Sequence, residues 1–325
     1  MHPTPVGTLL NDAALNIRAD NSSWRARFVR WAWITVGVNV LVILWGAWVR
    51  ATGSGAGCGS HWPLCNGVVV PPSPEAATII EFVHRLTSGV ALLAVLALFV
   101  AARRGYAPGH FARRSTSAAG AFMLIEAAIG AGLVVFGLVA GNTSMPRAVV
   151  GALHLVNTYL LLAALALSAE MGAEAVSPRW QVGRGEVALA ALSLGLLIVV
   201  GMTGAVTALG DTIFRPESLA AGIVQELDPA SHPLVRMRLI HPGVAVLASL
   251  FTAYYALTLS ERDARSSTRS LARWIWALLV AQLIAGAINV VLLAPLGLQV
   301  IHLLLSDLIW ILGIVLSARA FTAPR

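Results

Sequence analysis

The chain has 325 residues, of which 58% are hydrophobic and 11% are charged, and its mean hydropathy is +0.79. This composition excludes an ordinary soluble domain and is typical of a multi-pass membrane protein. The net charge of +7 does not indicate a nucleic-acid partner, because the arginines that carry it are placed as topology signals are in membrane proteins.

Eight apolar stretches are long enough to cross a bilayer as helices. In chain order they cover residues 30–50, 77–102, 115–140, 148–170, 185–209, 235–259, 272–293 and 298–319. The predicted fold class is therefore an all-α integral membrane protein with eight transmembrane helices.

The two halves of the chain share features in the same order. Glu126 and Gly130 in the third stretch have the spacing of Gln282 and Gly286 in the seventh. Because each half has an even number of spans, both halves have the same orientation in the membrane. The pattern predicts two tandem four-helix bundles related by a pseudo-two-fold axis along the membrane normal.

The domain boundaries follow from this division. We expect a cytoplasmic N-terminal tail (1–29), an N-terminal four-helix bundle (30–172), a cytoplasmic linker (173–184) and a C-terminal four-helix bundle (185–320). The longest outer loops, 51–76 and 210–234, would then cover the outer ends of the bundles.

The arginines predict the orientation. All 22 basic residues are arginine, and sixteen of them lie in segments that face one side. The six others are Arg50, Arg85, Arg147, Arg215, Arg236 and Arg238. Because cytoplasmic loops carry the excess of positive charge, both termini are expected in the cytoplasm of a cell-membrane protein.

The chain has two cysteines, Cys58 and Cys65, in the outer loop after the first span. An outward loop is oxidising in most cells, so a disulfide between them is favoured. Two free thiols or half of a metal site are the alternatives, although the six-residue gap is not a zinc-finger spacing.

Four histidines lie near the same, outer end of four predicted spans: His84, His154, His241 and His302. An imidazole in the hydrocarbon region is costly and calls for a partner. A single such histidine is usually an interhelical hydrogen-bonding residue. Two pairs at equivalent positions, one pair in each half, are what two axially ligated haems require.

Other polar residues lie near these histidines. Glu81 precedes His84 by one helical turn, which favours either a helix N-terminal acid or a carboxylate that acts on a substrate. Arginines near the outer interface would either contact haem propionates or extend to lipid headgroups. They are Arg50, Arg85, Arg236 and Arg238, and propionate contact is favoured for Arg85 because it adjoins His84.

Several motifs resemble those of the haem A synthase family of aerobic respiration. They are the run from Gly46 to Gly55 leading to Cys58, the run from Trp62 to Gly67, the Glu81–Arg85 segment and the single histidines of spans 4, 6 and 8. The resemblance extends from about Trp33 to Ala318. The second-half outer loop, 210–216, departs from some members because it has no cysteine pair.

The resemblance implies an oxidoreductase that converts the C8 methyl group of haem O to the formyl group of haem A, for use in terminal oxidases. It implies that His84 and His154 hold haem O and that His241 and His302 hold a haem b cofactor. Glu81 matches the family's essential carboxylate, and the cysteine pair matches one that is usually a disulfide.

The partners implied are haem O, membrane lipid, an electron acceptor that the residues do not identify and, from the pathway, a haem O synthase and oxidase assembly factors.

Three other functions compete with this interpretation. A dihaem cytochrome b that spans the membrane with its haems usually has two histidines about 13 residues apart on one helix, and no such pair is present. A transporter would show interrupted helices. A non-enzymatic haem carrier is distinguished only by Glu81.

Overall fold

The computed structural model describes residues 5–72, 74–263 and 265–322, with side chains from residue 22 onward. The long helices are α1 (Pro5–Ala51), α2 (Ala76–Gly105), α3 (Phe111–Val135), α4 (Met145–Gly172), α5 (Arg184–Ile213), α8 (Ile240–Arg262), α9 (Ser266–Val291) and α10 (Leu296–Thr322). The short helices are α6 (Leu219–Leu227) and α7 (Pro233–Arg236), with 3-10 turns at Ser54–Ala56 and Met237–Leu239.

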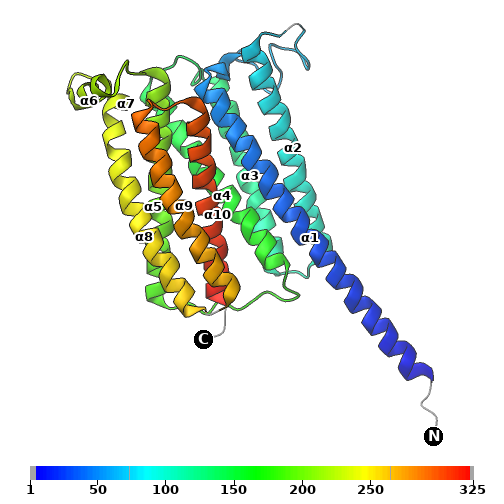
Figure 1. Ribbon diagram of the computed structural model, residues 1–325. Helices are drawn as coiled ribbons and strands as arrows, with labels where there is room; N and C mark the ends of the chain where they lie inside the picture. The colour runs from blue at the N-terminus through cyan, green and yellow to red at the C-terminus, as the bar shows by residue number, and fades with distance from the viewer. Residues whose placement is uncertain (1–4, 73, 264, 323–325) are drawn as a thin grey trace.

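The all-α membrane fold predicted from the sequence is confirmed. Eight helices are long and apolar enough to cross a membrane. Figure 1 shows them side by side, with the start of α1 and the end of α10 at the same end of the bundle. That end is called the inner end below, and the opposite end, which carries the loop between α1 and α2, the outer end.

One predicted boundary was wrong, and one predicted span lies within a longer helix. The third span ends at Val135 rather than at 140, because Gly137 adopts φ 63° and the Leu138 N–H donates to the Leu133 carbonyl at 2.8 Å. A left-handed glycine with this bond is a common helix stop. The predicted first span, 30–50, lies within α1, which begins at Pro5, so much of the segment expected as the tail (1–29) is helical, while residues 1–4 lie outside the described residues.

Helices α4 and α10 are the most buried, and they join the two halves of the chain. Tyr159 of α4 and Ser306 of α10 share a hydrogen bond of 2.6 Å between their hydroxyls. The Trp310 indole stacks on the Tyr159 ring at 4.9 Å and donates to the Tyr159 carbonyl at 2.7 Å. The interface between the halves is therefore specified by polar contacts within an apolar core.

The inner ends of the helices are held by ion pairs. Arg319 of α10 donates to both carboxylate oxygens of Glu170 of α4, each at 2.8 Å. Asp263, between α8 and α9, is buried and accepts from Arg265 and Thr268. Burial raises the pKa of Asp263, but the hydrogen bonds from Arg265 and Thr268 outweigh it and lower the pKa to about 2.

Candidate functional site

The four histidines lie on four different helices: His84 on α2, His154 on α4, His241 on α8 and His302 on α10. All four helices begin at the outer end of the bundle, and each histidine lies in the outer half of its helix (Figure 1). All four side chains are half-buried. The fold therefore brings the four imidazoles toward one level of the bundle, as their sequence positions predict.

The C-terminal pair has the separation that one shared metal ion requires. The ring centroids of His241 and His302 are 6.4 Å apart, and the ring planes are 82° apart. Metal–imidazole bonds of about 2 Å, with about 1.1 Å from nitrogen to ring centroid, would put two axial imidazoles about 6 Å apart. The observed separation matches that value.

Neutral polar groups contact this pair. The Thr203 hydroxyl lies 3.1 Å from Nδ1 of His241, and the Gln282 amide nitrogen lies 3.3 Å from Nε2 of His302. The second ring nitrogen of His302, Nδ1, is buried without a hydrogen-bond partner. Histidines that ligate metals usually have one ring nitrogen held by a polar group and the other free for the metal.

The N-terminal pair lies beside a carboxylate. Glu126 of α3 places Oε1 3.3 Å from Nδ1 of His154. The same carboxylate accepts from the Asn157 amide and the Thr158 hydroxyl, each at 2.5 Å. Nδ1 of His84 is buried without a hydrogen-bond partner. His84 and His154 are close enough to interact electrostatically.

Three of the four imidazoles lie against a glycine of the neighbouring helix. The pairs are Gly46 with His84, Gly204 with His241, and Gly286 with His302. A Cβ at these glycines would lie 3.0, 3.0 and 3.2 Å from the imidazole Cε1 atoms, tighter than ordinary van der Waals contact. The space for each ring therefore depends on the missing side chain.

The loop between α1 and α2 covers the outer end of α2. Cys58 and Cys65 form a disulfide, which confirms the pairing favoured by the sequence. Gly57 approaches α2 so closely that a Cβ would lie 2.4 Å from the Ala77 carbonyl group, and the Thr78 hydroxyl donates to the Gly57 carbonyl at 2.7 Å. The disulfide loop is thus fixed to the helix that carries His84.

Glu81 connects this loop to the histidine site. Its side chain is buried, Oε2 accepts from the Cys58 N–H at 2.8 Å, and Oε1 accepts from the Arg85 guanidinium. Arg85 also donates to the carbonyls of His61 and Leu64 at 2.6 and 2.7 Å. The carboxylate is therefore held in one position, one helical turn from His84, by the loop and by a cation.

The other arginines named from the sequence have distinct surroundings. Arg50 of α1 donates to the Ala208 carbonyl at 2.7 Å and to Gln299 at 3.1 Å, and so connects the two halves. Arg238 is buried and donates to the Gly210 carbonyl at 2.6 Å. Arg236 is exposed. Their role as propionate contacts stays a prediction.

The donor sets fit two haems with paired imidazole ligands. The evidence for this fit is the 6.4 Å separation of His241 and His302, the buried unpartnered ring nitrogens and the glycines beside three of the rings. Glu126 accepts hydrogen bonds from Asn157 and Thr158, the structural role that a half-buried carboxylate usually has. The sequence did not predict that its carboxylate would also lie 3.3 Å from His154.

Fold and site together define a multi-pass helical membrane protein with two pairs of histidines near its outer end. The sequence matches the COX15-CtaA family, described as cytochrome oxidase assembly proteins, over residues 29–314. The chain belongs to this family, and the resemblance inferred from its motifs is confirmed.

Curated relatives carry two different names. The chain is 48% identical over 297 residues to a protein named protoheme IX farnesyltransferase from Thermus thermophilus, covering 91% of this chain and 48% of that protein. It is 40% identical over 112 residues to a heme A synthase from Bacillus mycoides, covering 34% of this chain and 36% of that protein. The chain thus spans about half the length or less of these relatives.

Proposed function

We propose that this chain is a haem A synthase, which oxidises the C8 methyl group of haem O to a formyl group. One observation carries the proposal: in a chain of this family, each histidine of the N-terminal pair has a carboxylate near it, Glu126 at 3.3 Å from His154 and Glu81 three residues before His84 on the same helix. Carboxylates next to a reacting centre transfer protons or stabilise positive charge that develops there.

In this proposal His84 and His154 hold the substrate haem O. Oε1 of Glu126 lies 3.3 Å from Nδ1 of His154, although the two atoms form no hydrogen bond, and this proximity would favour ligation of the iron through Nε2. Glu81 would take up protons released as the methyl group is oxidised, while water would supply the oxygen atom of the formyl group and an acceptor outside this chain would take the electrons.

The C-terminal pair, His241 and His302, would hold haem b, which supplies one-electron redox chemistry when bound. Thr203 and Gln282 orient the two rings through neutral contacts. Neutral neighbours suit a resident cofactor that is not itself converted, because its function does not require side chains that transfer protons.

The finer topology belongs to the same proposal. Both termini lie in the cytoplasm, the two tandem bundles (30–172 and 185–320) are related by a pseudo-two-fold axis, and the haem sites face outward. Haem O would arrive from a haem O synthase, and the product would pass to oxidase assembly factors. Electrons leave to an acceptor outside this chain.

The test is pigment analysis of membranes from a host that makes haem O, with and without this chain, by chromatography and mass spectrometry. We expect haem A or its hydroxylated precursor only when the chain is present. Haem O that is bound but unchanged would contradict the proposal and favour a haem carrier or a dihaem cytochrome.

Farnesyl transfer is the second candidate, because the relative that matches over 91% of this chain is named a farnesyltransferase. The two functions differ in their starting material. In a host that makes haem b and farnesyl diphosphate but no haem O, a farnesyltransferase would produce haem O. We expect none, and haem O formed by this chain would make farnesyl transfer the better assignment.

A further inference from the structure

A basic cleft opens at the inner end of the bundle, between the end of α2 and the start of α3. Its volume is about 290 Å³, and the residues that line it are Arg103, Pro108, Gly109, Arg113, Arg114 and Ser117. No acidic side chain is among these residues. The cleft lies at the opposite end of α2 from His84, so it is separate from the histidine sites.

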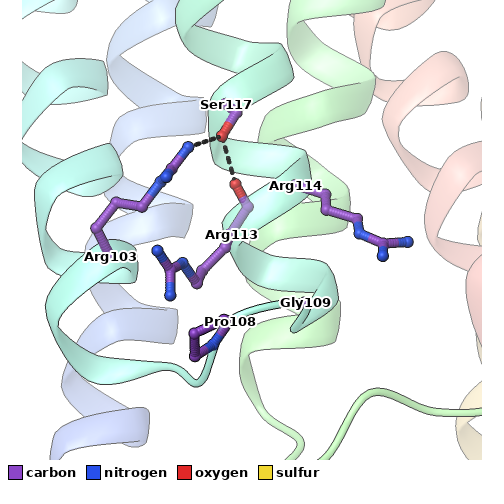
Figure 2. Close-up of a pocket in the computed structure, with 6 residues that line it drawn as sticks. All are labelled: Arg103, Pro108, Gly109, Arg113, Arg114 and Ser117. Carbon is purple, nitrogen blue, oxygen red and sulfur yellow. Dashed lines mark hydrogen bonds between the residues drawn. The ribbon is translucent and has the colours of Figure 1, made fainter.

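Two of the arginines face the same side of the cleft. Figure 2 shows the side chains of Arg103 and Arg113 on one side of α3, above Pro108, while the Arg114 guanidinium extends away from them. Arg103 donates to the Ser117 hydroxyl at 3.0 Å, and that hydroxyl donates to the Arg113 carbonyl at 2.6 Å. Ser117 therefore holds the Arg103 guanidinium against α3, one turn from Arg113.

The charge of this pair is not compensated. Among the described side chains, no carboxylate lies within ion-pair distance of Arg103 or Arg113. The polar groups that Arg103 and Arg113 contact, the Ser117 hydroxyl and the Tyr106 carbonyl, are neutral. Arginine presents a planar fork of donors that suits phosphate oxygens, so two adjacent forks without a carboxylate favour an anion.

The loop that forms the floor of the cleft is anchored. Tyr106 and His110 are buried and stack at 4.4 Å, and the Tyr106 hydroxyl donates to the Gly172 carbonyl of α4 at 2.5 Å. Nδ1 of His110 accepts from the Ala112 N–H at 3.1 Å. Burial lowers the pKa of His110, which favours the neutral ring. The cleft needs little reorganisation before it binds a ligand.

An exposed apolar stripe leads away from the cleft along α2. Val100, Leu96 and Leu93 precede Arg103 at helical spacings of three or four residues and therefore share its face. Their exposed fractions are 41%, 40% and 67%. In a membrane, this stripe runs from the headgroup level into the hydrocarbon, directly below Arg103.

We propose that this cleft binds the phosphate of an anionic phospholipid, with an acyl chain along the α2 stripe. Arg103 and Arg113 would share the phosphate oxygens, and Val100 and Leu96 would contact the acyl chain. Basic pockets between transmembrane helices at the headgroup level are suited to such lipids. The stripe favours a lipid over free phosphate, because free phosphate has no apolar group that could contact the exposed side chains of α2.

The test is native mass spectrometry of the purified full-length chain, titrated with phosphatidylglycerol or with phosphatidylcholine of the same acyl chains. The double variant Arg103→Gln/Arg113→Gln should bind phosphatidylglycerol about tenfold more weakly. The matched control is Arg269→Gln/Arg273→Gln, which removes the same charge from exposed arginines near the inner end of α9 and should leave the affinity unchanged.

A second variant preserves the net charge. Ser117→Ala removes the hydrogen bond that holds the Arg103 guanidinium against α3, and we expect about threefold weaker binding of phosphatidylglycerol. If the double variant does not fold, the affinity of Ser117→Ala for phosphatidylglycerol tests the proposal by itself. Wild-type affinity in Ser117→Ala, or an equal loss in the α9 control, would overturn the proposal. So would equal affinity for phosphatidylcholine, or complete displacement by millimolar inorganic phosphate, which would indicate a free-anion site.

Discussion

The two histidine pairs have similar surroundings but differ in the charge of the group beside them. In the N-terminal half, the Glu126 carboxylate contacts His154, whereas the Gln282 amide contacts His302 in the C-terminal half. Gly46 and Gly204 leave the same space beside the first imidazole of each half. One half therefore has ionisable groups beside its ligands, and the other has neutral ones.

The residue three positions before the first histidine of each half also differs between the halves. It is Glu81 before His84 and Arg238 before His241. Each holds an outer loop, but Glu81 accepts from a backbone N–H while Arg238 donates to backbone carbonyls. Under the proposed function, proton transfer would take place in the N-terminal half, because that half has the buried carboxylate at this position.

The largest effect is expected for Glu81→Gln. Gln keeps the shape of the side chain and an oxygen to accept from the Cys58 N–H, but it cannot take up a proton. We expect formation of haem A to fall by about a thousandfold with the bound haem retained. Glu75→Gln, at an exposed position before α2, is the control and should keep full activity. Chromatography of extracted pigments measures both, and haem A produced by Glu81→Gln or Glu81→Ala would contradict the catalytic role.

Replacing one histidine at a time distinguishes the two proposed haem sites. His241→Ala or His302→Ala should abolish the absorption of the resident haem in the purified protein, because one axial ligand is lost. His84→Ala and His154→Ala should keep that absorption and lose haem O instead. A normal resident-haem spectrum in both C-terminal variants would refute the assignment of the cofactor site.

Exchange of the polar partners makes each site resemble the other. Glu126→Gln should weaken retention of haem O by about tenfold, since partners that orient a ligating imidazole contribute that much. Gln282→Glu should lower the reduction potential of the resident haem, because a nearby carboxylate stabilises the more positive iron. A redox titration measures the second effect, and an unchanged potential would show that the charge at this position has no influence.

Filling the space beside the imidazoles should have a smaller effect. Gly204→Ala would place a Cβ 3.0 Å from His241 and should destabilise the protein by about 1–3 kcal/mol. Gly130→Ala, with nothing within 4 Å, should instead stabilise it by up to about 1 kcal/mol through helix propensity. The shift of the denaturation midpoint in detergent gives the sign, and equal shifts in both variants would argue against a fitted cage.

The smallest effect is expected at Asp263, far from both sites. Its pKa is lowered to about 2 in the folded protein from the ordinary 3.8, so its contribution to stability is present above about pH 4 and is lost as the pH falls toward 2. Asp263→Asn should remove that part of the acid sensitivity and leave haem content unchanged. Identical acid profiles for the variant and the original chain would show that the ion pair contributes nothing.

Sequence patterns predicted the eight spans, the histidine positions and the disulfide, because hydrophobic length, polar residues in apolar segments and cysteine location each have a local physical cause. The end of α3 was wrong because it depends on the left-handed conformation of Gly137. The contacts of Glu126 and of Arg50 depend on which helices become neighbours, and this is decided by packing across the whole bundle.

The most direct test of the account is the pigment content of the purified chain from a host that makes haem O. The account predicts haem b in an amount equal to the protein, lost in His302→Ala, together with a methyl-oxidised product of haem O that is absent in Glu81→Gln. Unmodified haem O in the original chain and in Glu81→Gln alike would contradict it.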